Sequence, residues 1–244
     1  MFLELFVFIV ILFFIAVIFY KQSTDHFEIL QLEAERISEL PDLYEDKSPI
    51  VIRGFQMPNL GTYSELQKRP HILQMAVAPK TSLQALLTDQ KRLQNFILNP
   101  ETAKFLAKET GLQTWFEHHL FTQLLPSEYT KFLFSFKTFL YPEHRGLFKT
   151  TAYQTLIAPT QGIAKVNVML SKMLPYLPNK WQGRRFDALS TRDTPLLNQI
   201  QFVEIKVKKG NLLLLPPHLI VDVASVEDAW IFIGEIHNPI SLLI

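Results

Sequence analysis

The side chains that could carry chemistry in this chain are few and widely spaced. The chain has seven histidines, and three of them stand beside carboxylates or in a turn of the C-terminal half: His144 after Glu143, His237 two residues after Glu235, and His218 after two prolines. Imidazole and carboxylate groups bind transition metals, so these residues are candidates for an unusual metal site. Scattered histidines usually satisfy local hydrogen bonds instead, and we adopt that interpretation.

Two further groups of side chains could form binding sites. His118 and His119 are adjacent in a segment with helical periodicity, and side chains one residue apart on a helix point about 100° apart, so they do not readily share a metal. The segment NKWQGRR (179–185) combines Trp181 with Arg184 and Arg185, and these residues are candidates for contact with an anion or a partner. The alternative, which we favour, is a solvated loop whose tryptophan packs locally.

Composition and motifs narrow the function classes. The formal net charge is +1, which argues against a dedicated nucleic-acid binder. The sequence contains no Gly-rich phosphate loop, no nucleophile elbow and no HExxH pattern. It has no cysteine, which suits a reducing compartment.

The N-terminal segment MFLELFVFIVILFFIAVIFYK predicts a transmembrane anchor over residues 1–21. A helix of about 20 residues is about 30 Å long, which matches the hydrocarbon core of a bilayer. A cleaved signal peptide would have basic residues before the apolar run and small residues at its end, and neither is present. Because Lys21 and Arg36 follow the run, the positive-inside rule puts the soluble part in the cytosol or inside a membrane-bounded particle.

Behind the anchor, the spacing of apolar residues predicts helices first and strands later, an α+β arrangement. A helix from Ser23 or Thr24 to Pro41 is expected to act as a stalk or linker over residues 22–46. A strand is expected at 48–55 and a helical region at 62–140, in which Pro100 begins one helix. The helices are expected at 81–98, 99–120 and 126–140, and the later strands at 150–158, 162–171, 200–207, 211–216, 219–225 and 229–244.

Three stretches together resemble the cupin-like, JmjC-type domains, which are double-stranded β-helix (jelly-roll) proteins that include iron- and 2-oxoglutarate-dependent hydroxylases. They are SPIVIRGF (48–55), GLFKTTAYQTLIAPTQGIAKVNVMLSKMLPYLP (146–178) and VKKGNLLLLPPHLIVDV (207–223). The resemblance covers residues 47–244 and implies a barrel core built from 47–55 and 146–244. An anchor followed by such a domain also resembles membrane proteins of large DNA viruses of algae and protists.

The resemblance also implies where iron would bind, and those positions lack its ligands. Active members hold iron with two histidines and one carboxylate. Counting along the motifs puts Lys149 and Thr151 at the first two ligands, Val221 at the last histidine and Ala164 at the lysine that binds the keto acid. Thr155 stands at an asparagine position of the family. The site is therefore predicted to be degenerate, with no metal and no cofactor.

Three hypotheses follow for function. The first is a single-pass, membrane-anchored, non-catalytic cupin-like domain that binds an unknown protein or small molecule or serves a structural role. The second is an Fe(II)/2-oxoglutarate-dependent oxygenase with relocated ligands, drawn from His144, His218, Asp222 and His237. The third is a structural envelope protein. In each case the lipid bilayer is the partner of residues 1–21, and no nucleic acid is expected.

Overall fold

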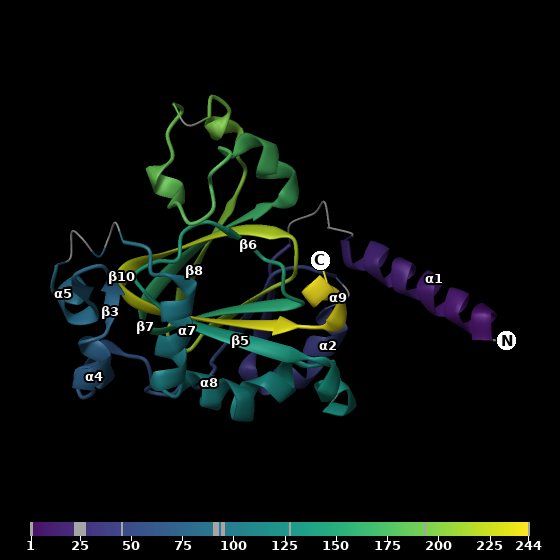
Figure 1. Cartoon of the computed structure of the whole chain (residues 1–244), viewed down its shortest axis with the longest axis horizontal. Helices are drawn as coiled ribbons and strands as arrows, with labels where there is room; N and C mark the ends of the chain where they lie inside the picture. Colours follow the sequence, from purple (N-terminus) through teal and green to yellow (C-terminus); the bar gives the residue numbers. More distant parts are fainter. Residues whose placement is uncertain are drawn as a thin grey trace.

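A bent sheet surrounded by helices forms most of the molecule, and one long helix projects from it (Figure 1). The computed structural model describes residues 2–21, 28–44, 46–89, 93, 96–126, 128–192 and 194–243. Most of the helical segments precede the long strands in the sequence, so the chain is α+β, as its sequence predicts.

Two long antiparallel strands, β7 (Gln154–Leu170) and β10 (Leu219–His237), run side by side through the whole sheet. β7 contains Gly162 at a φ of 71°. Opposite it, the register of β10 shifts three times between Ser225 and Ile231. Because bulges bend a strand and increase its twist, the pair divides the sheet into two halves.

Shorter strands extend the long pair on both sides of the bend. In one half, β9 pairs with the start of β7 and β5 with the end of β10, while β2 and β1 continue outward from β9. In the other half, β8 pairs with the end of β7 and β6 with the start of β10. The bounds are β1 Leu30–Glu33, β2 Ile50–Arg53, β5 Ser135–Pro142, β6 Phe148–Lys149, β8 Val203–Lys208 and β9 Leu212–Leu215; β3 (Ala76–Ala78) and β4 (Thr81–Ser82) form a separate hairpin.

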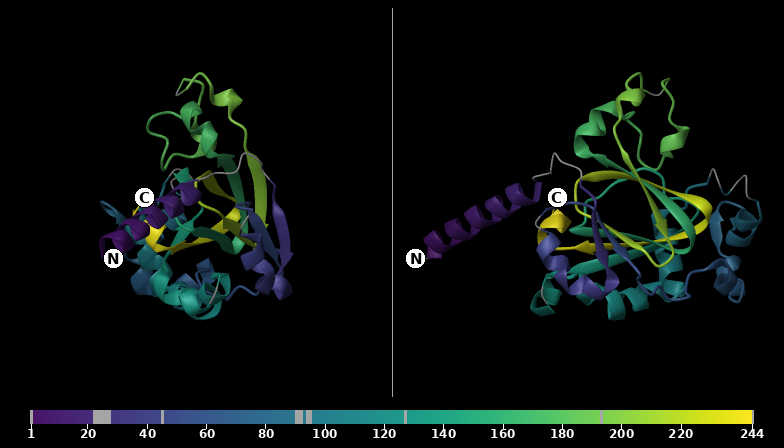
Figure 2. Two further views of the ribbon diagram at one scale, coloured as in Figure 1. Left: turned by 90° about the vertical axis from the view of Figure 1, so that its right-hand side faces the viewer. Right: turned by 180° about the vertical axis from the view of Figure 1, so that it is seen from behind.

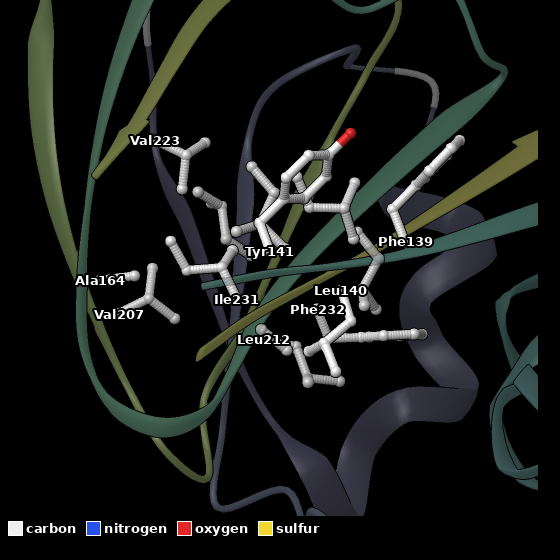
Figure 3. Close-up of a cluster of buried hydrophobic side chains, with 14 of the residues drawn as sticks. Phe139, Leu140, Tyr141, Ala164, Val207, Leu212, Val223, Ile231 and Phe232 are labelled. Carbon is white, nitrogen blue, oxygen red and sulfur yellow. The ribbon is translucent and has the colours of Figure 1, made fainter. Parts of the chain in front are cut away.

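The inner faces of the two halves meet in one apolar core. Val223, Ala164 and Val207 from one half lie across from Tyr141 and Ile231 of the other (Figure 3). Successive residues of a strand point to opposite faces, and both faces of these strands are largely buried. The long apolar runs in the sequence reflect this burial on two sides.

Helices cover the outer face of the half that contains β5. The Phe116 ring packs 5.5 Å from Phe136 and 5.8 Å from Phe232, and it occupies the space left by the missing side chain of Gly234. The helices are α2 Leu40–Leu43, α3 Tyr63–Leu66, α4 Pro70–Leu73, α5 Leu83–Thr88, α7 Pro100–Glu109 and α8 Leu112–Trp115, and α8 continues into a π-helical segment, Phe116–Phe121. This layer excludes water from one outer face of the sheet.

The segment 171–202 covers the other half, above the sheet in Figure 1. It is built from 3-10 turns and irregular chain. Its apolar residues, Trp181 among them, form a second buried cluster with Met169 and Ile220 on the outer face of β7 and β10. Asp222 and Asn167 lie on that same outer face, because they alternate with inward-facing residues.

The projecting helix is α1 (Phe2–Lys21), which extends away from the sheet (Figure 2). Residues Leu3–Lys21 are long and apolar enough to cross a membrane, and they are not buried against the rest of the described chain. The helix therefore exists where the sequence predicts it.

The C-terminal end of α1 is held against the sheet. The Tyr20 hydroxyl donates to the Thr151 carbonyl oxygen at 2.8 Å, and the Lys47 ammonium group donates to the Phe19 carbonyl oxygen at 2.6 Å. His218 Nε2 lies 3.0 Å from the Tyr20 carbonyl oxygen. The carbonyl groups of a last helical turn have no intrahelical partners, so the Lys47 and His218 contacts cap α1.

The continuous helix expected between Ser23 and Pro41 is wrong over Leu30–Glu33, and only the described segment from Ala34 onward is helical. Residues 22–27 lie outside the described residues, Leu30–Glu33 form β1 in parallel with β2, and a 3-10 segment, Ala34–Glu39, follows. The edge of β2 that faces away from β9 has backbone N–H and C=O groups that need hydrogen-bond partners. Pairing with them favours a strand at residues 30–33 more strongly than the local composition favours a helix. The described part of this segment packs on the sheet.

Two other boundaries differ from expectation. The helix expected over 126–140 gives way to strand β5 at Ser135, where a run rich in aromatic residues pairs with β10. At the C-terminus, β10 ends at His237 and helix α9 (Pro239–Leu243) replaces the expected strand, with the Asn238 side chain accepting from the Ser241 N–H at 2.7 Å. The start of α7 is confirmed, since Asn99 caps it just before Pro100.

We expect Gly162→Ala to destabilise the fold far more than Gly183→Ala. Both glycines have positive φ, so each alanine costs about 1–2 kcal/mol of conformational strain. A Cβ at Gly162 would also overlap the Glu227 carbonyl oxygen, whereas one at Gly183 meets open space. Denaturant unfolding of the full chain in mild detergent, followed by circular dichroism, should show a loss of at least about 3 kcal/mol for Gly162→Ala. Equal losses would contradict the close approach of β7 and β10.

Candidate functional site

Val221 lies deep in the inner core. Its side chain is fully buried, and its cross-strand partners are Phe148 in β6 and Val168 in β7. Cross-strand partners point to the same face of a sheet, so three hydrocarbon side chains meet here. Ala164, also fully buried, adds a methyl group to the same core. None of these groups can donate a lone pair to a metal.

Lys149 and Thr151 are exposed and do not share the inner face with Val221. The cross-strand partner of Lys149 is Ile220, whose side chain packs in the outer cluster, so Lys149 points away from the core. Phe148 and Thr150 are the buried residues of this stretch. The buried residues near Val221 are therefore Phe148 and Thr150, each one position before the residue that the family motif assigns to a ligand, Lys149 or Thr151.

Thr150 holds the two-proline turn in place. Its hydroxyl donates to the Pro216 carbonyl oxygen at 2.9 Å and accepts from the Leu219 N–H at 2.9 Å. The backbone repeats the link, because Thr150 N–H donates to Leu219 O and Thr150 O accepts from His218 N–H. The buried Thr150 hydroxyl thus uses its hydrogen bonds to hold the turn.

Arg145 brings a positive charge to the inner face beside Phe148. Its guanidinium carbon lies 3.6 Å from the centre of the Phe148 ring and 5.7 Å from that of Tyr141. Its Nη1 lies 3.3 Å from Glu235 Oε1. A guanidinium over an aromatic face and beside a carboxylate is stabilised by both, so this cation is fixed.

Polar groups cluster around that ion pair. His237 Nε2 lies 3.5 Å from Glu235 Oε2, and Thr155 is the cross-strand partner of Glu235. Burial opposes ionisation of Glu235, but the His237 ring and the Arg145 charge together hold the pKa of that carboxyl below its usual range. Burial raises the pKa of Tyr141 to about 12. Among the described residues, the Tyr141 hydroxyl, the Thr155 hydroxyl and His237 Nδ1 have no hydrogen-bond partner.

These residues do not fit an iron centre of the kind that the resemblance implies. Such a centre needs two histidines and a carboxylate on one face of the metal. The inner positions carry Phe148, Thr150 and Val221 instead, and the neighbouring guanidinium repels a divalent cation. Among the residues that the structure describes, no three histidine, aspartate or glutamate side chains gather as metal ligands.

His144 lines a separate pocket at the bend of the long strands. The pocket has a volume of about 780 Å³, and its charged lining residues are Glu143, Arg185, Glu227 and Asp228. The His144 side chain is 2 % exposed, and its Nε2 has no hydrogen-bond partner among the residues that the structure describes. Burial, aided by the charge of Arg185, lowers the pKa of His144 to about 4, so the ring is neutral at pH 7. Burial also raises the pKa of Glu143, and the charge of Asp228 adds to this.

Asp222 forms a buried polar pair with Asn167 under the segment 171–202. Asn167 Nδ2 lies 3.4 Å from Asp222 Oδ2, while Asp222 Oδ1 and Asn167 Oδ1 have no hydrogen-bond partner in the described part of the chain. Burial raises the pKa of Asp222 to about 6, and the charge of Asp187 contributes in the same direction. The carboxyl faces away from the inner core that contains Val221.

The four alternative ligands are therefore at four different places. His237 lies on the inner face, Asp222 on the outer face, His144 in the pocket at the bend, and His218 against the end of α1. Burial lowers the pKa of His218, and neighbouring lysines add to this effect. The structure does not bring these side chains together.

The tryptophan and arginines of 179–185 are also separated. Trp181 is buried in the outer cluster, Arg184 is half-buried, and Arg185 reaches the pocket, with its Nη2 3.8 Å from Asp187 Oδ2. His118 and His119 are exposed on the π-helical segment. Neither group forms a site with the residues around the inner core.

Comparison with known proteins does not identify the chain. No family model and no curated protein matches it. The crystal structure of hydroquinone 1,2-dioxygenase from Sphingomonas sp. TTNP3, with 4-hydroxybenzoate bound, is similar with 15% sequence identity and a TM-score of 0.30. The match covers 45% of this chain and 62% of the dioxygenase chain, less than two thirds of either. A likeness this distant assigns neither a family nor an activity.

Sequence reasoning missed Arg145 as a site residue. Glu143 has a φ of 66°, and His144 forms a backbone bridge with Ala224. This turn directs the side chains of His144 and Arg145 to opposite faces of the sheet, with Arg145 on the inner face. The arginine and Glu235 are 90 residues apart in the sequence. The signal in the sequence that could have indicated Arg145 is its position directly before Gly146 and a strand.

We expect Asp222→Asn to remove a pH dependence of stability. The pKa of Asp222 is near 6 in the folded chain and near 3.8 in the unfolded chain. The folded state therefore binds more protons between these values, and the free energy of unfolding falls as pH rises from about 4 to 6. The variant should be more stable than the parent at pH 7.5 by on the order of 2 kcal/mol and similar to it at pH 4.

Denaturant unfolding at pH 4, 5, 6 and 7.5 measures this difference. Asp42→Asn is the matched control, because that carboxylate is exposed on α2 and contributes nothing to the pKa of Asp222. Parallel stability curves for the parent and Asp222→Asn would show that Asp222 ionises normally.

Proposed function

We propose that this protein is a membrane-anchored, non-catalytic binding module whose two-halved sheet is a cupin-like double-stranded β-helix. The long strands β7 and β10 support this fold, since each contributes to both halves and bends between them. The apolar core between the halves keeps its shape through hydrocarbon packing and needs no metal.

The observation that carries the non-catalytic assignment is the fixed guanidinium of Arg145 over the Phe148 ring. It lies in the region where the family resemblance expects iron, beside the fully buried Val221. A metal site would require this cation to leave, ligand atoms in place of the hydrocarbon of Phe148 and Val221, and release of the Thr150 hydroxyl from the turn. A binding role requires none of these changes.

The length and apolar composition of α1 support the proposal that it anchors the protein in a membrane. It is exposed along its length, and a bilayer would cover that surface. Its C-terminal end carries Lys21 and is capped by Lys47, so the positive-inside rule favours a cytosolic position for the domain, or the interior of a membrane-bounded particle.

The pocket beside His144 supports a ligand-binding role. Its volume of about 780 Å³ lies within the range of small-molecule sites. Its three carboxylates outnumber Arg185 among the described lining residues. The neutral ring of His144 also lines this pocket and adds no positive charge to it. We propose a small organic cation, such as an amine, as the ligand class.

We expect the purified protein to bind no stoichiometric iron. The full chain in detergent would be incubated anaerobically with Fe(II) and 2-oxoglutarate, desalted and measured by elemental analysis, with succinate formation as the second measurement. The expected result is less than about 0.1 iron per chain and no succinate above background, because the inner positions lack ligands. Arg145→Ala serves as a variant that removes the competing cation.

Two results would overturn the non-catalytic assignment. One is iron near one equivalent per chain in the parent protein. The other is turnover of 2-oxoglutarate that is lost in His144→Ala or His237→Ala, which would favour the oxygenase with relocated ligands.

We expect putrescine to bind in the pocket, and 1,4-butanediol and succinate not to bind. The two controls match putrescine in length but lack its positive charges. Calorimetry on the full chain would measure the affinity, and the double variant Glu143→Gln, Asp228→Asn should weaken it by at least about tenfold. Glu204→Gln, an exposed carboxylate on β8, is the matched control. Equal binding of putrescine and butanediol would contradict the cationic ligand class.

A further inference from the structure

A group of lysines surrounds the end of α1. Lys149, Lys47 and Lys21 lie close enough to His218 for their charges to lower its pKa, in addition to the effect of burial. Lys149 and Lys21 are exposed, and Lys47 holds the last turn of α1 through the Phe19 carbonyl oxygen. Three lysines from three separate segments of the chain therefore lie near the C-terminal end of α1.

Exposed leucines lie beside the same end of the helix. Helix α9 contacts α1, and its Leu242 and Leu243 side chains are 57% and 71% exposed. Both helix ends lie on the side of the sheet from which α1 projects (Figures 1 and 2). The polar and apolar parts thus form one surface, which we call the juxtamembrane surface: Lys21, Lys47, Lys149, Leu242 and Leu243.

We propose that the juxtamembrane surface rests on the anionic phospholipid headgroups of the bilayer that α1 spans. This inference depends on the membrane anchor of the proposed function and goes beyond it, because an anchor alone leaves the domain free to turn away from the bilayer.

The chemistry of the surface matches a headgroup layer. Lysines next to a membrane-spanning helix are attracted to phosphate and to anionic lipids, and each strengthens the attraction about fivefold. Leucines of a short helix can enter the boundary between headgroups and acyl chains. Since the apolar run of α1 ends at Lys21, the phosphate groups and the lysines are at the same level.

The attachment of α1 makes this orientation specific. Tyr20 and Phe19 are tied by hydrogen bonds to Thr151 and Lys47, and the Tyr20 ring packs edge-on against His218 at 5.3 Å. The axis of the helix is thus set relative to the sheet. When α1 crosses a bilayer, this attachment turns the juxtamembrane surface toward the headgroup layer, and the lysines then determine how closely the surface approaches anionic lipid.

The full chain offers a direct test, because it contains no cysteine. A spin label would be attached at Leu243→Cys, and a control label at His71→Cys in α4, which lies at the opposite end of the molecule from α1 (Figure 1). The protein would be placed in nanodiscs of phosphatidylcholine alone or with phosphatidylglycerol. Accessibility to oxygen relative to a water-soluble nickel complex reports the depth of each label.

We expect the Leu243 label to be lipid-exposed in the anionic discs, with an oxygen-to-nickel accessibility ratio at least about threefold above that in phosphatidylcholine. The His71 label should be exposed to water in both. Lys149→Glu should return the Leu243 label to water, whereas Lys149→Arg and the control Lys206→Glu, at an exposed position on β8, should not.

Three outcomes would overturn the inference, and they are distinguishable. A water-exposed Leu243 label in both lipids, with α1 resistant to carbonate extraction, would disprove headgroup contact and leave the anchor intact. Extraction of the chain by carbonate would disprove the anchor itself. Dipolar broadening between Leu243 labels, independent of lipid charge, would assign the surface to a second copy of the chain.

Discussion

The antiparallel ladder between β7 and β10 is the interaction on which the rest of the molecule depends. It joins the two halves of the sheet, because each strand contributes to both. It also sets the alternation that sends Val221 and Val223 inward and Asp222 outward. A slip of one residue would bury Asp222 and Lys165 in the apolar core, so the register is strongly determined. The bend at Gly162 then decides where the pocket beside His144 opens.

This alternation separates three polar environments, and the adjacent residues His144 and Arg145 belong to different ones. Arg145, Glu235 and His237 share the inner face, where a low dielectric strengthens their interactions. Asp222 and Asn167 are buried on the outer face, and His144 opens to a pocket. Arg145 places a positive charge of the chain itself in this core. Hydrocarbon side chains at Val221 and Phe148, and a guanidinium that packs against aromatic rings, stabilise the core.

Much of the strand pattern could be predicted, because it depends on local periodicity. The apolar run before Pro216 and the strand after it form as expected, and so does the buried position of Val221. What could not be predicted depends on contacts distant in the sequence. Residues 30–33 become a strand because β2 has an open edge, and Ser135 begins a strand because β10 is available to it. The inward direction of Arg145 depends on the backbone at Glu143, which composition does not report.

The parallel pairing of β1 with β2 has a mechanical consequence. Leu30 pairs with Ile50 and Glu33 with Arg53, and β1 is the first described strand after α1. When α1 is pulled along the direction of β1, the tension runs parallel to the two strands. The hydrogen bonds between them then carry the load together in shear and do not open one after another. In the proposed membrane-anchored state, this pairing would protect the rest of the sheet from forces transmitted through α1.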